Sequence, residues 1–448
     1  MKEIFLTNSL SNNKEKFIPR TAGKVSMYVC GITPYDFCHL GHARAYISFD
    51  MIRRVFEYFN YEVTYIQNFT DIDDKIIARA NEKGISAQSL AQNFIDAYFE
   101  MAHSLKIKDA TTYPKATETI PEIIQYIEKL VQKEFAYVVA GDVYFRTRKF
   151  KDYGKLSGRD LDKLKSGARV EVNVQKEDPL DFALWKAAKP EEPFWPSPFG
   201  NGRPGWHIEC SVMSEKYLGL PIDIHGGGRD LIFPHLENEI AQSEACSGMH
   251  FVNYWLHNGF VNIGSEKMSK SLGNMLWVKD LIKKYSPQAL RFTFLTTHYR
   301  SPIDFDEKLL VEAGTAIKRL HSPFLEAHQV LEVSAQIKEL SSNIENALAD
   351  DFNAAQAISY LFEYASIINQ TKNKNVLADY QKFLELFGLY DESLVKVVAS
   401  SDVNALLEKR IAAKKAKNFK DADALRDQIL ELGFIIEDTP QGARLVKK

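Results

Sequence analysis

Two histidines, His39 and His42, stand where a strand is expected to give way to a helix. Apolar residues alternate along 24–30, which predicts a β-strand, and recur at helical spacing along 45–59, which predicts an amphipathic helix. A helix start presents free backbone N–H groups and the positive end of the helix dipole, so this junction favours an anion such as phosphate. The histidines could donate further hydrogen bonds to that anion, although such a pair, taken alone, is more often structural than catalytic.

Four other side chains, Cys30, Cys210, His235 and Glu239, are of the types that bind Zn²⁺. They are spread too widely for a zinc finger, and buried thiols with a solvated glutamate are the alternative. Cys30 ends the first expected strand, and the other three fall close to loops expected at the same edge of the sheet. Pro234 suits the first position of a helix, on which His235 and Glu239 would share one face.

Two polar segments at strand ends are candidates for substrate contacts. Residues 68–75 contain a carboxylate cluster that could bind a metal, but an N-cap with acids in the first helical turn explains it as well. Thr70 lies at the edge of the expected crevice and is the better candidate for a substrate contact. Along 226–230, three glycines let the backbone approach a ligand, and Asp230 could bind a ribose hydroxyl or cap a tight turn.

The histidine pair has a distant counterpart in Lys267-Met268-Ser269-Lys270-Ser271. Together with His39-Leu40-Gly41-His42, this lysine motif resembles the paired signatures of class I aminoacyl-tRNA synthetases. The first signature departs from the family pattern only by its leucine, which keeps an apolar side chain. The resemblance implies contacts with ATP, made by His39 and His42 to the phosphates, by Gly41 to the adenine ring, and by Lys267 and Lys270 to the pyrophosphate.

Within that class, the similarity to cysteinyl-tRNA synthetases is the most specific. It is carried by residues 27–50, 68–75, 205–241 and 258–274, and it extends over essentially the whole chain. The family holds a zinc ion at the base of its active site with residues that match Cys30, Cys210, His235 and Glu239. This chain has Leu236 where the family often has a second histidine, and Arg229 also differs from some relatives.

The resemblance implies a role for each candidate residue. Catalytic roles are implied for His39, His42, Lys267 and Lys270, ATP binding for Gly41, Asp230 and Lys270, cysteine binding for Thr70, Trp206 and His225, and zinc binding for Cys30, Cys210, His235 and Glu239.

The activity that the resemblance implies has two steps. L-Cysteine would react with ATP, accompanied by Mg²⁺, to give cysteinyl-adenylate and pyrophosphate, and the cysteinyl group would then pass to the 3′ end of tRNA(Cys). One zinc ion per chain would select the substrate thiolate, because cysteine and serine differ by one atom and a hydrophobic pocket separates them weakly. A thiolate is a soft ligand for Zn²⁺ and a serine hydroxyl is not, so an editing domain is not required.

Composition restricts the class of protein. The chain has 448 residues, 45% of them apolar and 26% charged, which is typical of a soluble globular protein of about three domains. The net charge of −3 gives no global attraction to nucleic acid. With no signal pattern and no apolar run of membrane-spanning length, we expect a cytoplasmic monomer that does not bind membranes. The four cysteines, of which Cys38 and Cys246 have no assigned role, do not suggest a disulfide framework.

The order of the expected elements predicts an α/β fold. A Rossmann-like parallel-sheet catalytic domain would carry an inserted connective domain and be followed by a helical bundle and a small C-terminal mixed module. The insertion would contain a helix over 120–132 and a hairpin over 136–147, and helical structure is expected over 279–300. The expected limits are 1–112 and 204–250 for the two halves of the catalytic domain, 113–203 for the connective domain, 251–306 for the stem-contact region with the lysine motif, 307–395 for the bundle and 396–448 for an anticodon-binding module.

The C-terminal module contains a basic run, 409–420, with six basic residues, no acidic residue and Phe419 among them. A solvated helix face explains such a run, but the resemblance implies contacts with an anticodon. Two other functions share the catalytic features: a ligase that joins activated cysteine to a small amine, and a non-catalytic RNA-binding paralogue. The first would lack the C-terminal module, and the second would have no need of both phosphate motifs.

Overall fold

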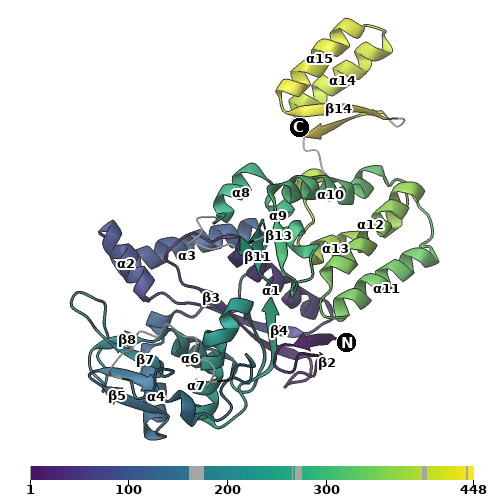
Figure 1. Cartoon of the computed structure of the whole chain (residues 1–448). Helices are drawn as coiled ribbons and strands as arrows, with labels where there is room; N and C mark the ends of the chain where they lie inside the picture. The colour runs from purple at the N-terminus through teal and green to yellow at the C-terminus, as the bar shows by residue number, and fades with distance from the viewer. Residues whose placement is uncertain are drawn as a thin grey trace.

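The centre of the molecule is a four-stranded parallel sheet with the strand order β10-β9-β3-β4 (Figure 1). The computed structural model describes residues 2–160, 176–264, 266–267, 275–395, 401–439 and 442–447. In chain order, the first two strands of this sheet are joined by a helix, which confirms the predicted strand–helix–strand unit. The strands are β3 (Lys24–Ile32), β4 (Glu62–Phe69), β9 (Ile222–Gly228) and β10 (Val252–Asn258). A short hairpin, β1 (Phe5–Asn8) and β2 (Asn13–Lys16), precedes them.

Helix α1 (Leu40–Tyr58) connects β3 to β4 and begins earlier than its apolar pattern indicates. It begins at Leu40 because the His39 side chain caps it, accepting a hydrogen bond from the backbone N–H of Gly41. Its apolar face, including Ile47 and Val55, is fully buried in the main hydrophobic core. Burial of this face fixes the helix against the sheet, and with it the position of the two histidines at its start.

The segment after β4 forms two helices, α2 (Asp74–Lys83) and α3 (Ala87–Ser104). Asp73 is the N-cap of α2, and its carboxylate accepts a hydrogen bond from the backbone N–H of Lys75. Asp74 makes ion pairs with Lys186 and Arg203 of the insertion. The capping interpretation of this acidic segment is therefore confirmed.

The inserted segment has its own small sheet and shares an apolar core with residues that follow it in the chain, among them Ile208 and Val212. Helix α4 (Ile120–Gln132) and the hairpin of β5 (Ala136–Val139) and β6 (Asp142–Phe145) confirm the predicted helix and hairpin. Strands β7 (Phe182–Ala187) and β8 (Gly202–Pro204) complete an antiparallel sheet. Helix α6 (Trp206–Leu218) follows β8 almost immediately, so the insertion is joined to the second half of the parallel-sheet domain through the start of this helix.

The helical structure predicted over 279–300 is confirmed over most of the segment, and it is divided into two helices, α8 (Val278–Lys284) and α9 (Pro287–Leu295). Pro287 lacks the N–H that would continue the first helix, and the Ser286 hydroxyl accepts a hydrogen bond from the N–H of Ala289 to cap the second. A small sheet of β11 (Val261–Ile263), β12 (Glu266–Lys267) and β13 (Ile303–Phe305) flanks these helices.

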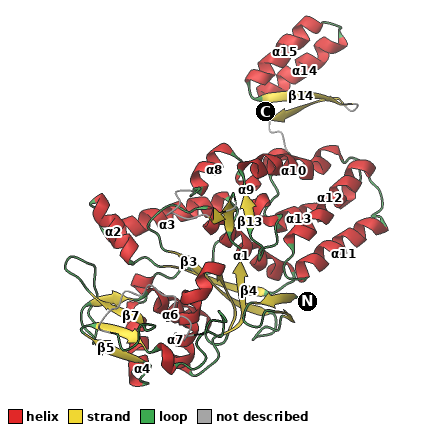
Figure 2. Cartoon of the chain, in the orientation of Figure 1, coloured by secondary structure: helices red, strands yellow, loops and turns green. Residues whose placement is uncertain are grey.

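Helices make up most of the chain after β13, as Figure 2 shows. The predicted bundle consists of α10 (Glu307–Glu326), α11 (Ala335–Ala349), α12 (Ala354–Thr371) and α13 (Leu377–Leu386). Their buried side chains are continuous with the core around α1, so bundle and sheet share one hydrophobic cluster. No helix in the described ranges is long and apolar enough to cross a membrane.

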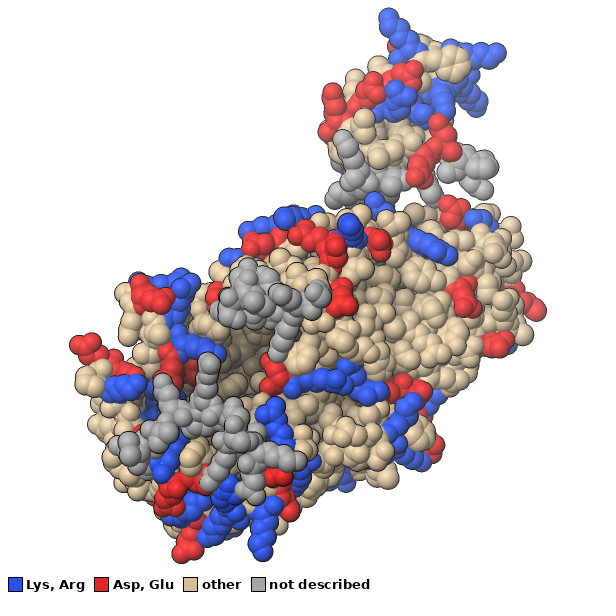
Figure 3. Space-filling model, in the orientation of Figure 1, with Lys and Arg blue, Asp and Glu red and all other residues tan. Residues whose placement is uncertain are grey.

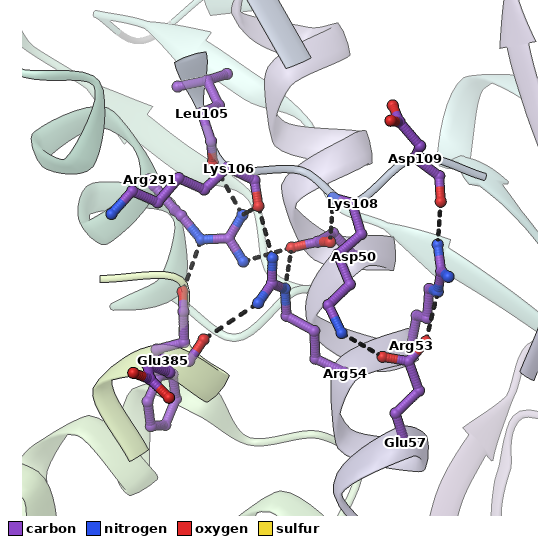
Figure 4. Close-up of polar contacts among 11 residues, drawn as sticks. Asp50, Arg53, Arg54, Glu57, Leu105, Lys106, Lys108, Asp109, Arg291 and Glu385 are labelled. Atoms are coloured by element: carbon purple, nitrogen blue, oxygen red, sulfur yellow. Dashed lines mark hydrogen bonds and ion pairs between the residues drawn. The ribbon is translucent and has the colours of Figure 1, made fainter. Parts of the chain in front are cut away.

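A buried ion-pair network joins α1 to α9 and to the end of α13 (Figure 4). Asp50 of α1 accepts hydrogen bonds from Arg291 of α9 and from Nε of Arg54, the latter at 2.7 Å. Arg291 also donates to the carbonyl oxygens of Leu105 and Phe387, at 3.1 and 2.6 Å. Asp50 is 3% exposed and Arg291 is 0% exposed, so this contact is shielded from solvent.

The C-terminal module stands apart from the rest of the molecule (Figure 1). Its elements are α14 (Ser401–Lys415), α15 (Phe419–Glu431) and a hairpin of β14 (Phe434–Thr439) and β15 (Gly442–Lys447), which confirms the predicted final hairpin. The helices pack on the hairpin around a separate apolar cluster that includes Val403, Ile429 and Leu445. Lysine and arginine side chains gather on this module (Figure 3).

Candidate active site and metal centre

A cavity of about 450 Å³ opens at the carboxyl ends of β3 and β9, beside the start of α1. Crevices at the carboxyl ends of parallel strands are where ligands bind in open α/β sheets, and this volume suits a small-molecule substrate. The cavity is lined by Val29, Cys30, Gly31, Ile32, Thr33, Tyr35, His39, Gly41, His42, Ala45, Tyr46, Lys75, Trp206, Gly227, Gly228, Asp230, Leu231, Asn258, Gly259, Phe260, Val261 and Met275. The candidates His39, Gly41, His42, Asp230 and Trp206 are therefore brought together.

The two histidine rings are stacked at the start of α1, with centroids 3.8 Å apart. Nδ1 of His39 accepts from the N–H of Gly41 at 3.1 Å, and Nδ1 of His42 accepts from the N–H of His39 at 3.3 Å. Because both Nδ1 atoms accept, each neutral ring carries its proton on Nε2. Two Nε2–H donors at a helix start that lines the cavity can bind an anion.

The lysine motif is only partly within the described residues. Strand β12 pairs antiparallel with β11, whose Val261 lines the cavity, and this places the backbone of Lys267 beside that strand. The side chain of Lys267 and the whole of Lys270 lie outside the described residues.

Cys30, Cys210, His235 and Glu239 come together as a buried cluster under the cavity. One ligand atom from each lies within 4.8 Å of the ligand atoms of all the others. Nε2 of His235 is 3.0 Å from Oε1 of Glu239, and Sγ of Cys30 is 3.8 Å from the same oxygen. Sequence reasoning therefore identified four residues that the fold assembles from β3, α6 and the start of α7.

The predicted helix start at Pro234 is confirmed. Phe233 has extended backbone angles, and helical backbone begins at Pro234 and continues into α7 (Glu237–Ser247). His235 and Glu239 stand at positions i and i+4 of this helical segment, and their side chains pair. Cys210 reaches the cluster from α6.

The protonation of the cluster follows from burial and close contact. A hydrogen bond with Cys30 lowers the pKa of Cys210 to about 6, although burial opposes this. Burial alone would lower the pKa of His235, but Glu239 and Cys210 raise it to about 10. Burial alone would raise the pKa of Glu239, but His225 and His235 lower it to about 2. The lowered pKa values favour the negatively charged forms of Cys210 and Glu239, although both side chains are buried. A bound cation would compensate this negative charge.

The four side chains fit a zinc ion. Two thiols, one imidazole and one carboxylate are its usual ligand types, and a tetrahedral site needs ligand atoms roughly 3.3–3.8 Å apart. The observed spread of at most 4.8 Å closes to that geometry with small side-chain movements. All four residues are buried, so the site is protected from bulk water.

The candidates Thr70 and His225 lie behind the cavity and not among its lining residues. His225 is fully buried, and its Nε2 lies 2.9 Å from Oε2 of Glu239. Thr70 is 2% exposed and hydrogen-bonds to Glu209, the neighbour of the cluster residue Cys210. His225 therefore contacts the cluster directly through Glu239, and Thr70 contacts it only through the neighbour of Cys210.

Sequence reasoning missed two residues, one at the cavity and one beside the cluster. Lys75 lines the cavity, with its ammonium 5.5 Å from the ring centroid of Tyr35. His207 hydrogen-bonds to His235. A sequence signal existed for the second, because His207 and Cys210 are three positions apart and share one face of α6.

Close backbone packing explains one glycine at the site. A Cβ atom on Gly31 would lie 1.5 Å from the carbonyl oxygen of Asn68 on β4. The N–H of Gly31 also donates to the Asn68 side chain at 2.9 Å. Only glycine fits here, and the contact holds the ends of β3 and β4 together beside Cys30.

Comparison with known proteins gives matches to three family models. The model described as the tRNA synthetases class I (C) catalytic domain matches residues 16–315. A DALR domain model matches residues 343–390, and a cysteinyl-tRNA ligase anticodon binding domain model matches residues 399–444.

Full-length relatives are similar over nearly the whole chain. The chain is 50% identical to the cysteine–tRNA ligase of Caldicellulosiruptor saccharolyticus, over 98% of this chain and 99% of the relative. It is also 50% identical to the cysteine–tRNA ligase of Carboxydothermus hydrogenoformans, over 98% of both chains.

Solved structures show the same fold at lower identity. A Mycobacterium tuberculosis methionyl-tRNA synthetase in complex with methionyl-adenylate gives a TM-score of 0.56 at 16% identity, over 81% of this chain and 88% of that chain. The ternary LeuRS–tRNA–LeuAMS complex from Agrobacterium radiobacter K84 gives a TM-score of 0.59 at 12% identity, over 85% of each chain. The predicted α/β synthetase fold is confirmed.

Proposed function

Because this chain belongs to the cysteine–tRNA ligases, a family of class I aminoacyl-tRNA synthetases, we propose that the cluster of Cys30, Cys210, His235 and Glu239 holds one Zn²⁺ ion that selects the substrate. The observation that carries this proposal is the convergence of four buried ligand atoms within 4.8 Å of one another. Bound zinc would supply a soft Lewis acid for the thiolate of L-cysteine, which a serine hydroxyl cannot match.

The residues around the cluster define where the amino acid lies. Trp206 lines the cavity and stacks on His235, with ring centroids 4.2 Å apart. It therefore covers the metal ligand on the cavity side and would enclose the side chain of cysteine. Thr70 and His225 complete the proposed cysteine site, with His225 acting through its contact with Glu239.

The activation step depends on positioning and charge. The carboxylate of cysteine attacks the α-phosphate of ATP, and negative charge grows on the phosphate oxygens. We assign the Nε2–H groups of His39 and His42 to those oxygens, and Gly41 and Asp230 to adenosine. Lys267 and Lys270 would neutralise the pyrophosphate together with Mg²⁺.

The C-terminal module is proposed to bind the anticodon of tRNA(Cys). Arg410 is 6% exposed and pairs with Asp438, and Lys414 pairs with the same carboxylate. These two cations of the basic run therefore stabilise the module, and the exposed Lys415 and Phe419 are better placed for RNA. Cations would bind phosphates, and the aromatic ring would stack on an unpaired base.

We also propose the larger organisation that the sequence indicates. The catalytic domain would comprise 1–112 and 204–250, with 113–203 as the connective domain and 251–306 as the stem-contact region. Residues 307–395 would form the bundle and 396–448 the anticodon-binding module. The working form would be a cytoplasmic monomer.

Two assays in sequence test this function. Cysteine-dependent exchange of pyrophosphate into ATP measures the first step, and charging of tRNA(Cys) measures the second. Exchange without charging would favour a ligase for a small amine, and loss of both would favour an RNA-binding paralogue. Zinc removal should abolish the preference for cysteine over serine in the exchange assay, and an unchanged preference would refute the metal's role.

A further inference from the structure

The cluster residue His235 has a histidine partner on its far side. Nδ1 of His235 lies 2.8 Å from Nδ1 of His207, which stands in the first turn of α6. The other ring nitrogen, Nε2, lies 3.0 Å from Oε1 of Glu239 and faces the cluster. His235 therefore bridges the cluster and His207 with its two nitrogens.

This bridge fixes which nitrogen carries a proton. Two imidazole nitrogens can hydrogen-bond only when one donates and the other accepts. A metal ligand must offer a lone pair, so Nε2 of His235 carries no proton when it binds the ion, and Nδ1–H is then the donor. His207 accepts at Nδ1 and carries its own proton on Nε2.

We infer that His207 is a positioning residue of the metal centre, which accepts the Nδ1–H of His235 and so keeps the Nε2 lone pair directed at the ion. The inference rests on the proposed zinc site and adds a residue to it. Hydrogen bonding at the far nitrogen also makes the ligating nitrogen more basic, which strengthens its bond to a cation.

The surroundings hold His207 in this orientation. The ring of Phe182, on β7 of the insertion, meets the ring of His207 edge to face, with centroids 5.7 Å apart. Trp206 stacks on His235 from the cavity side at 4.2 Å. His207 thus contacts both the inserted sheet and the metal ligand His235. Its hydrogen bond to His235, more than its apolar packing on Phe182, is the contact that would affect the bound ion.

Glu239, the other ligand that is not a thiol, has a comparable partner. Its Oε2 lies 2.9 Å from Nε2 of His225, and its Oε1 faces the cluster. His235 and Glu239 therefore each direct one side-chain atom at the cluster and a second one at a neighbouring histidine. Such outer contacts change metal affinity by about 10–100-fold when they are removed.

The test compares two substitutions in the full-length protein. His207→Asn keeps an acceptor, because its Oδ1 can lie close to the position of the imidazole Nδ1, whereas His207→Leu keeps bulk without an acceptor. Zinc affinity is measured by competition with a chromophoric chelator, and Co²⁺ is used as a spectroscopic probe of the ligands. His103→Leu, which removes an exposed histidine of α3, is the control.

We expect His207→Leu to weaken zinc binding by about 10–100-fold and His207→Asn to lie within a few-fold of the wild type. Cobalt absorption of His207→Leu should also differ from that of the wild type. Equal zinc affinity in His207→Leu and the wild type would overturn the inference, as would equal losses in His207→Leu and His207→Asn. If His207→Leu fails to fold, His207→Ala takes its place, with melting of the metal-free protein as the check. A wild type that binds no zinc would refute the metal centre itself, and this inference with it.

Discussion

Replacement of Arg291 by methionine should destabilise the body of the protein by breaking its contact with Asp50. Methionine approximates the length of the arginine side chain but leaves the buried carboxylate without its main partner. Removal of one member of a buried ion pair typically costs about 3–5 kcal/mol. Arg54 still contacts Asp50 at 2.7 Å, so we take the lower value, about 3 kcal/mol.

Thermal unfolding followed by calorimetry measures this effect on the transition of the body that contains α1, α9 and α13. With an unfolding entropy of about 2.1 cal/mol/K per residue, about 3 kcal/mol lowers the midpoint of a body of roughly 300–400 residues by about 4–5 °C. Arg53→Met is the matched control, because Arg53 pairs with the partly exposed Glu57 on the same helix and should lose at most about 1 kcal/mol. Equal melting midpoints for Arg291→Met and Arg53→Met would show that the buried pair stabilises the protein no more than the partly exposed pair does.

The same pair has a defined pH dependence. Burial alone would raise the pKa of Asp50, but Arg291 and Arg54 lower it below its ordinary value. Because the pKa of Asp50 is lower in the folded protein, its ionised carboxylate stabilises the fold. This stabilisation is fully present above the unfolded-state pKa of about 3.9, and it is lost as the pH falls through the folded-state pKa. The difference in midpoint between wild type and Arg291→Met should therefore stay constant from pH 8 to pH 5 and shrink below about pH 4.

Three further changes test separate parts of the account. Lys270→Ala should slow adenylate formation by about 100-fold in pyrophosphate exchange and leave the apparent affinity for cysteine within a few-fold; normal adenylate formation would contradict its role. Gly31→Ala should lower the melting midpoint and the yield of folded protein, because its Cβ would meet the Asn68 carbonyl at 1.5 Å; wild-type melting would show that the two strands separate easily. Deletion of 396–448 should preserve pyrophosphate exchange and abolish efficient charging of tRNA(Cys); undiminished charging would place anticodon recognition elsewhere.

Local patterns predicted the elements that position the phosphate site. The alternation along 24–30 and the helical spacing after His42 predicted the strand, the helix and their junction, because alternate residues of the strand (Val25, Met27 and Val29) and the apolar face of the helix are buried together in one core. Four metal-ligand candidates could also be grouped, since the strand ends and helix starts that carry them meet at one edge of a parallel sheet.

Features that depend on distant contacts could not be predicted. Nothing near Asp50 in the sequence indicates Arg291, because the pair forms only when α9 packs on α1. The break at Pro287 was hidden by apolar spacing that continues across it, although proline and a preceding serine are themselves signals. His207 was within a recognised segment, but its contact with His235 forms only when the two helical segments that carry them come together in the fold.

The proposed zinc ion, held by Cys30, Cys210, His235 and Glu239, would bind the sulfur of the substrate. X-ray absorption at the zinc edge of the purified protein, recorded with and without L-cysteine, tests this binding most directly. The account predicts two sulfur ligands in the free protein and three after L-cysteine is added, with no change after L-serine. A sulfur count that stays at two with saturating L-cysteine would contradict it.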